Sequence, residues 1–412
     1  MCNEAHSARR EAHPTRREAR VGEDAPLRAA SSANPIRRDR GALGTLVWCG
    51  QMWASLQPLV GLPGLWLLQL ARLAAFVALT LPVLGPQFCR YLLHRRVFKN
   101  VPYGPSVRHQ LDVYAPPPAR DGAPHPVVIF VSGGAWIIGY KAWPYLQALF
   151  LQANGVLVVC PDYRNFPHAA IPGMADDVDA AIAWTLRNVR RLRGDARNVT
   201  LVGQSAGAHL VALVLAERAA AQAARPTGGA PCKRARRAWR LEQLRSWVGV
   251  SGPFSLAPFV ETLHARGLDR RLLSRLFPNP AVLSPLARVE ALGAGGRAAL
   301  ARLPCLLAHG TADATVPWAQ TADFAAVLRA AGVCVRVELY QGKSHTDPIL
   351  EGPMSGDDAL GARLLALVRA QRPARAKSTG EEGGEEEACV GLPGALVLPG
   401  AVLHLARWVN PF

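Results

Sequence analysis

"LVGQSAGAHLVALVLAER", residues 201–218, is the stretch of this sequence that decides the fold. An apolar run ends in Gly203-Gln204-Ser205-Ala206-Gly207 and continues directly into a helical pattern. Glycines on both sides of a serine let a strand and a helix approach closely, and the tight turn between them exposes the serine hydroxyl. The pattern predicts a nucleophile elbow with Ser205 at its apex. An ordinary strand-to-helix turn could carry the same five residues, so the rest of the chain has to distinguish the two.

Strand and helix patterns alternate along most of the chain. Apolar runs that predict strands lie at 111–114, 127–131, 155–164, 198–204, 246–251, 303–310 and 333–340, and helical patterns lie at 174–192, 318–331 and 356–372. Continuous apolar strands separated by helices are typical of a mostly parallel sheet that is covered on both faces. We therefore predict an α/β fold, with the proline- and phenylalanine-containing segment 253–300 as a partial lid.

The charge and composition of the chain indicate which kind of molecule it binds. The 412 residues carry a formal net charge of +17, and half of them are hydrophobic. Such a basic balance favours nucleic acid or an anionic membrane surface. The arginines are scattered over termini and insertions and no nucleic-acid-reading motif occurs, so membrane lipid is the expected partner and nucleic acid is not. The eight cysteines show no spacing typical of a metal site, and we expect neither a metal nor a cofactor.

Changes in composition divide the chain into five regions. They are a basic disordered tail (1–40), a membrane-anchoring region (41–98), a catalytic domain (99–373), an acidic linker (374–389) and an apolar C-terminal segment (390–412).

The anchoring region holds two apolar runs, Ala42–Ala71 and Leu73–Cys89, separated by Arg72 and interrupted by prolines that should kink any helix. About 20 apolar residues are needed to span a bilayer, so the first run is long enough and the second is marginal. Arginines flank the region at both ends, which places both flanks in the cytosol. A two-pass or a re-entrant hairpin meets this condition; a helix lying in the membrane plane is the alternative.

A serine nucleophile needs a base and an acid that orients the base. In folds with a nucleophile elbow the chain order is serine, then carboxylate, then histidine, each at the carboxyl end of a strand. "HGTADATVP" follows the strand at 303–310 and offers Asp313, and "LYQGKSHTDP" follows the last strand and offers His345. Asp347 is the rival carboxylate. The sequence thus predicts a catalytic triad of Ser205, Asp313 and His345.

Two further histidines and one loop bear on the site. His309 is interpreted as support for the acid loop, and His209, one helical turn after Ser205, as a less favoured catalytic candidate. "SGGAW", residues 132–136, follows the strand at 127–131. Its glycines allow backbone N–H groups to point at an oxyanion, together with the N–H that follows the nucleophile. The predicted oxyanion and substrate-binding residues are Gly133, Gly134, Ala135, Trp136, Gln204 and Ala206.

The stretches "VSGGAWIIGYKAW", "CPDYRNFP", "DDVDAAIAW" and "GQSAGAHL" together resemble the isoprenylcysteine alpha-carbonyl methylesterases, a membrane branch of the α/β-hydrolases. The likeness covers residues 70–370, and the final "RWVNPF" is also similar to the carboxyl end of that family. Ser132 stands where the wider superfamily has a histidine, and we interpret it as a marker of this branch.

The resemblance implies an α/β-hydrolase fold and hydrolysis of the methyl ester on a prenylated cysteine at a protein C-terminus. It also implies residence in the endoplasmic reticulum or Golgi membrane. Trp136, Tyr140, Trp143 and the apolar residues of 254–277 are then expected to line a groove for the prenyl chain. Alternatives on the same scaffold are another carboxylesterase, a lipid deacylase or an arylformamidase. A non-catalytic binding protein or a membrane scaffold would be expected to lack the histidine or a reactive serine.

Overall fold

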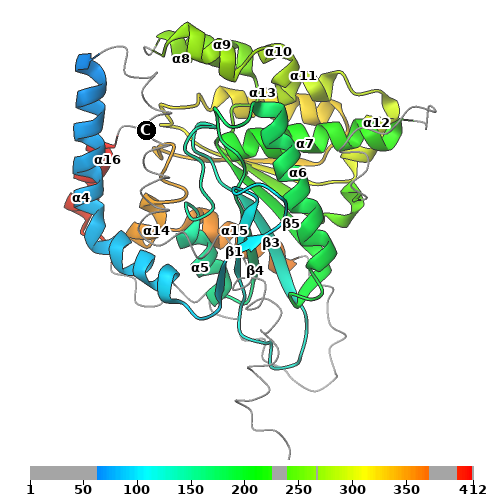
Figure 1. Ribbon diagram of the computed structural model, residues 1–412, viewed down its shortest axis with the longest axis horizontal. Helices are drawn as coiled ribbons and strands as arrows, with labels where there is room; N and C mark the ends of the chain where they lie inside the picture. The colour runs from blue at the N-terminus through cyan, green and yellow to red at the C-terminus, as the bar shows by residue number, and fades with distance from the viewer. Residues whose placement is uncertain (1–62, 225–238, 266–267, 371–396, 411–412) are drawn as a thin grey trace, which may run out of the picture.

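The computed structural model describes residues 63–224, 239–265, 268–370 and 397–410, which form eight strands in one sheet with helices around it (Figure 1). The strands are β1 (Val97–Pro102), β2 (Gln110–Tyr114), β3 (His125–Val131), β4 (Leu157–Pro161), β5 (Gly194–Gln204), β6 (Ser246–Val250), β7 (Cys305–Gly310) and β8 (Val335–Tyr340). Their spatial order is β1-β2-β4-β3-β5-β6-β7-β8.

The sheet is mostly parallel, as predicted. β3 to β8 pair in parallel, whereas β2 runs antiparallel to both β1 and β4. β1 was not predicted, because Lys99 and Asn100 interrupt its apolar alternation where the pairing with β2 shifts register. It begins at Val97, two residues before the predicted start of the catalytic domain.

Helices cover both faces of the sheet. α6 (Ile171–Asn188), α7 (Ala206–Ala223) and α13 (Ala319–Ala330) contribute to one hydrophobic core, and α5 (Tyr145–Ala153) and α15 (Ala359–Ala370) contribute to the other. Strand residues point alternately into the two cores; Ile129 enters the first and Val128 the second. The continuous apolar runs of the sequence are explained by this burial on both faces.

Five helices occupy the segment that we predicted as a partial lid: α8 (Leu256–Ala265), α9 (Arg270–Leu276), α10 (Pro280–Leu283), α11 (Pro285–Glu290) and α12 (Ala294–Ala301). They run along the upper edge of the molecule in Figure 1. Phe259 and Phe277 of this segment are buried and pack on Trp136, so the segment covers one side of the elbow.

The end of the first apolar run and the whole second run share one helix, because α4 (Pro63–Leu93) runs through Arg72 and includes Pro82 and Pro86. Arg72 is accommodated by donating hydrogen bonds to the carbonyl oxygens of Trp408, Val409 and Asn410, at the end of α16 (Gly400–Val409). Figure 1 shows α4 and α16 side by side, in agreement with their contacts. Within the described residues, Ala71–Leu93 is the one helical stretch long and apolar enough to cross a membrane, on length and composition alone.

Several predicted regions lie outside the described residues. They are the tail (1–40), the first part of the anchoring region up to residue 62, the acidic linker (374–389), and residues 225–238 of the basic insertion. The described part of the C-terminal segment contains α16.

Candidate active site

Ser205 lies in the turn between β5 and α7, with φ of 52° and ψ of −124°. A positive φ is unfavourable for a residue with a Cβ atom, and such strain is concentrated at functional sites. Gly207 permits the turn, because a Cβ atom added there would overlap the carbonyl oxygens of Val131 and Ser132. The Ser205 N–H donates to the carbonyl of Val250, which fixes the elbow to β6 (2.8 Å).

Ser205, His345 and Asp313 form one continuous hydrogen-bonded chain. His345 Nε2 is 2.9 Å from Ser205 Oγ, and His345 Nδ1 is 2.7 Å from Asp313 Oδ2. Asp313 follows β7 and His345 follows β8, so the carboxyl ends of three parallel strands bring together residues that are far apart in sequence. Because a carboxylate only accepts, Nδ1 donates its proton to Asp313, and Nε2 is left to accept from the serine.

Asp313 is held as a charged acceptor. Its Oδ1 accepts the N–H groups of Thr315 and Val316, both at 2.8 Å, and its Oδ2 also lies 3.0 Å from His309 Nε2. Burial alone would raise the pKa of Asp313, but hydrogen bonds from His309 and His345 hold this pKa well below its usual range. The prediction that His309 supports the acid loop is confirmed by this contact.

Asp347, the rival carboxylate, is bound to partners other than His345. Its Oδ2 accepts the N–H of Ser344 (2.9 Å), and its Oδ1 accepts from Arg407 Nη2 (2.6 Å). Both oxygens are therefore engaged, and His345 is paired with Asp313 instead.

The loop at 132–136 lies beside the elbow, but one of its backbone N–H groups already has a hydrogen-bond acceptor. Gly133 N–H donates to Gln204 Oε1 (3.1 Å), so this N–H is bound to a side chain and does not face a substrate oxygen as we expected. Gln204 thereby ties the loop to the elbow.

Gly134 has φ of 124°, and Ala135 and Trp136 have φ of 50° and 60°. Three consecutive positive φ values give the loop a tight, strained path. Ala206 is the first residue of α7, where an N–H group has no partner within the helix.

Residues of the "CPDYRNFP" stretch brace this loop, a role that sequence reasoning missed. Tyr163 Oη donates to the carbonyl of Ser132 (3.1 Å), and Asn165 Nδ2 donates to the carbonyl of Gly139 (2.9 Å). Ser132, which we interpreted as a marker of this branch, donates from Oγ to the carbonyl of Tyr140 (3.0 Å). The side chain of Ser132 therefore also braces the loop. The only signal in the sequence was a cluster of polar residues directly after a buried strand.

Lys141 forms a second support that sequence reasoning missed. Its Nζ is 3.1 Å from Asp112 Oδ1, and both side chains are at most 2% exposed. Burial favours the neutral amine, but the charge of Asp112 overrides it and raises the pKa of Lys141. Tyr91 of α4 donates to Asp112 Oδ2 (2.6 Å). The carboxylate of Asp112 therefore links α4 to Lys141, which follows the loop at 132–136.

His209 is not part of the catalytic chain. Its Nδ1 accepts from Trp136 Nε1 (3.3 Å), and its Nε2 donates to the carbonyl of Leu283 (2.9 Å). Burial lowers the pKa of His209 to about 4, which keeps the ring neutral. Trp136 itself is only 3% exposed, beneath Phe259 and Phe277, so it lies under the lid and is not an open groove wall. Trp143, in contrast, is 42% exposed.

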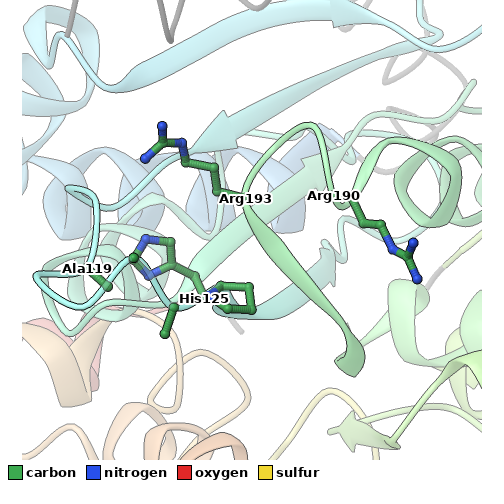
Figure 2. Close-up of a pocket in the computed structure, with 7 residues that line it drawn as sticks. Ala119, His125, Arg190 and Arg193 are labelled. Atoms are coloured by element: carbon green, nitrogen blue, oxygen red, sulfur yellow. The ribbon is translucent and has the colours of Figure 1, made fainter. Parts of the chain in front are cut away.

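A cavity of about 410 Å³ lies away from this chemistry. Figure 2 shows His125, Arg190 and Arg193 around it, near the start of β3 and β5. Ser205 follows the opposite, carboxyl end of β5, so this cavity and Ser205 lie at different ends of the strand.

Comparisons with known proteins agree with the fold and identify the family. The BD-FAE family model matches residues 111–328. A probable isoprenylcysteine alpha-carbonyl methylesterase of Oryza sativa subsp. japonica is 34% identical over 84% of this chain and 80% of its own length. The isoprenylcysteine alpha-carbonyl methylesterase of Arabidopsis thaliana is 31% identical over 84% of this chain and 77% of its own length. An inhibited esterase B of Lactobacillus rhamnosis shares the fold, with a TM-score of 0.54 and 21% identity over 73% of this chain and 96% of its own.

Proposed function

This chain belongs to the isoprenylcysteine alpha-carbonyl methylesterase family and is a serine hydrolase of carboxylic esters, and from that premise we propose that it demethylates prenylated cysteine methyl esters through Ser205, His345 and Asp313. The observation that carries the assignment of these three residues is the hydrogen-bonded chain from Ser205 Oγ through His345 to Asp313.

The proposed reaction has two halves. Ser205 Oγ attacks the ester carbonyl carbon while His345 Nε2 takes the hydroxyl proton, and the negative charge of Asp313 stabilises the imidazolium. His345 then returns the proton to the methoxy oxygen, and methanol leaves the acyl-enzyme. Water then attacks the acyl carbon while His345 Nε2 takes one of its protons, and His345 returns this proton to Ser205 Oγ as the acyl C–O bond breaks. The released carboxylic acid loses its remaining proton to solvent and becomes a carboxylate.

We propose that the oxyanion binds to the N–H groups of Ala206 and Gly134. Ala206 supplies an N–H at the start of α7, where the helix dipole also favours negative charge. Gln204 acts indirectly, because its hydrogen bond to Gly133 holds the loop next to the elbow. Ala135 and Trp136 continue the same loop and shape the space above Ser205.

We propose that the prenyl chain binds between the lid and the segment that contains Tyr140 and Trp143. Phe259 and Phe277 cover Trp136 in the described state, so α8 and α9 must separate from it to admit a long apolar chain. A prenyl chain gains about 0.8 kcal/mol for each methylene-sized group that it buries, so this surface would set specificity. Trp136→Ala should therefore lower the preference for a prenylated ester over a short one.

We propose that the 41–98 region anchors the enzyme in the endoplasmic reticulum or Golgi membrane, with the tail and the catalytic domain in the cytosol. Within α4, polar Thr80 and Gln87 face inward, whereas Val77 and Leu81 are 48% and 57% exposed. An apolar outer face is suited to lipid. Two complete spans and a re-entrant hairpin both keep the flanks on one side. Phe76 packs against α16, so one side of α4 is covered by the protein and only its outer side is available to lipid.

Methanol release tests the proposed substrate. Purified enzyme in detergent is given farnesylcysteine methyl ester, a short-alkyl thioether analogue and p-nitrophenyl acetate. We expect kcat/KM for the prenylated ester to exceed that for the short analogue by several orders of magnitude, because the lost burial weakens transition-state binding. A preference for p-nitrophenyl acetate would reduce the assignment to a general carboxylesterase. Near-normal turnover by Ser205→Ala would refute the nucleophile.

Protease protection on sealed microsomes tests the proposed topology. Both the 1–40 tail and the 99–373 domain should be digested from the cytosolic side. Protection of the domain with digestion of the tail would mean an odd number of spans and would contradict the proposal.

A further inference from the structure

The loop that carries His345 is held from outside the α/β core by the last helix of the described chain. Arg407 of α16 donates to Asp347 Oδ1 from Nε (3.1 Å) and Nη2 (2.6 Å). Asp347 is 1% exposed on its side chain, and its other oxygen accepts the N–H of Ser344. The ion pair thus clamps the turn Ser344–Asp347, which has His345 inside it.

A second contact holds the residue next to His345. Asn410 Nδ2, directly after α16, donates to Thr346 Oγ1 (2.6 Å) and to Glu351 Oε1 (2.5 Å). Thr346 Oγ1 in turn donates to Glu351 Oε1 (2.8 Å). All three side chains are buried. The backbone on the C-terminal side of His345 is therefore fixed by α16 at two successive residues.

α16 is itself fixed to α4. Arg72 donates to the carbonyl oxygens of Trp408 (3.1 Å), Val409 (3.3 Å) and Asn410 (3.0 Å), where the helix ends and its carbonyls lack intrahelical partners. Phe76 of α4 packs against Ala406 and Val409. An unbroken path of contacts leads from the apolar helix α4, through α16, to the loop of His345.

We propose that α16 is a positioning element for His345, with Arg407 and Asn410 as positioning residues and Arg72 as the link that makes their placement depend on α4. This inference rests on the proposed function, since it assigns His345 the role of base. The requirement is geometric. The Nε2 atom has to stay at 2.9 Å from Ser205 Oγ, and a displacement of about 1 Å in a catalytic group can cost on the order of 10² in rate.

Residues of the α/β core also hold the His345 loop, and this limits how much activity should be lost when the contacts from α16 are removed. Gln147 of α5 donates to the carbonyl of Pro348 (3.0 Å), and Asp313 still pairs with the imidazole in any variant of α16. Loss of the clamp should therefore loosen His345 without releasing it.

The first test is Arg407→Ala in the full-length protein, compared with His404→Ala, an exposed position on the same helix. We expect kcat for the ester substrate to fall about 10- to 100-fold with KM within about twofold, because the change affects the geometry of the triad and not the apolar groove. Arg407→Lys should recover only part of kcat, since it restores the charge but not the two-pronged contact. His404→Ala should behave as wild type.

Labelling with a fluorophosphonate separates geometry from substrate binding. The rate of labelling of Ser205 should fall in parallel with kcat in Arg407→Ala and in Asn410→Ala, and by a smaller factor in Arg72→Ala. Thermal unfolding of each variant shows whether the fold is intact. Variants that fold normally and keep wild-type kcat and labelling would overturn the inference while leaving the proposed function intact. Activity in Ser205→Ala would refute the proposed function instead.

Discussion

Replacing Asp313 by Asn should abolish most of the activity through the wrong histidine tautomer. Oδ1 of Asp313 accepts two backbone N–H groups at 2.8 Å, so the amide oxygen of Asn has to occupy that position. The amide NH2 group then takes the place of Oδ2, 2.7 Å from His345 Nδ1, and donates to it. The imidazole proton moves to Nε2, which faces Ser205 and can no longer accept its proton.

The reverse orientation of the Asn amide does not rescue the variant. It would set the NH2 group against the N–H groups of Thr315 and Val316, and each buried N–H without an acceptor costs about 1–3 kcal/mol. We therefore expect kcat to fall on the order of 10⁴-fold, or about 5 kcal/mol in activation free energy.

The assay for this prediction is methanol release under saturating substrate, together with the rate of fluorophosphonate labelling. Asp323→Asn, an exposed carboxylate on α13, is the matched control and should keep wild-type kcat. An Asp313→Asn enzyme that is correctly folded and retains more than a tenth of wild-type kcat would refute the tautomer argument.

Gly207→Ala should prevent the elbow from forming, because the new methyl group collides with the carbonyl of Val131, and both folded protein in detergent extracts and fluorophosphonate labelling should be lost. Lys141→Met should lower the free energy of unfolding by about 3–5 kcal/mol in urea titrations by leaving the buried charge of Asp112 unpaired, and adding Asp112→Asn should restore part of it. Burial and then the charge of a neighbouring aspartate raise the pKa of Glu351 to about 7 from its ordinary 4.5. The folded state therefore binds more protons than the unfolded state between these values, and stability should fall as pH rises from about 4.5 to 7. Glu351→Gln should flatten this slope in melts at pH 5 and pH 8; an unchanged slope would contradict it.

The strands and the catalytic chain could be predicted because their signals are local. β3 to β7 each contain an apolar run, and β8 alternates apolar and charged residues. Ser205, Asp313 and His345 follow β5, β7 and β8. The rule that parallel strands end at one edge of the sheet then brings the three residues together without any knowledge of distances.

The contacts that support the site could not be predicted, because they depend on partners that are distant in the chain. Nothing near Arg72 indicates that the carbonyl oxygens of Trp408, Val409 and Asn410 will accept from it, so the sequence was interpreted as two apolar runs separated by this arginine. The same holds for Gly133, whose glycine pattern predicted an open N–H group. The amide of Gln204, which occupies it, belongs to a different strand.

The contact between Arg72 and the end of α16 joins residues 336–338 positions apart, and this has a consequence for biosynthesis. At about 5–20 residues per second, roughly 17–68 s pass between synthesis of Arg72 and synthesis of its acceptors. Throughout that interval Phe76 and its neighbours on α4 lack the surface that later covers them, and they depend on lipid or a chaperone to avoid aggregation. A chain that lacked α16 would still contain Ser205, Asp313 and His345 but would leave Phe76 of α4 uncovered, and such a chain should be a substrate for quality-control proteolysis.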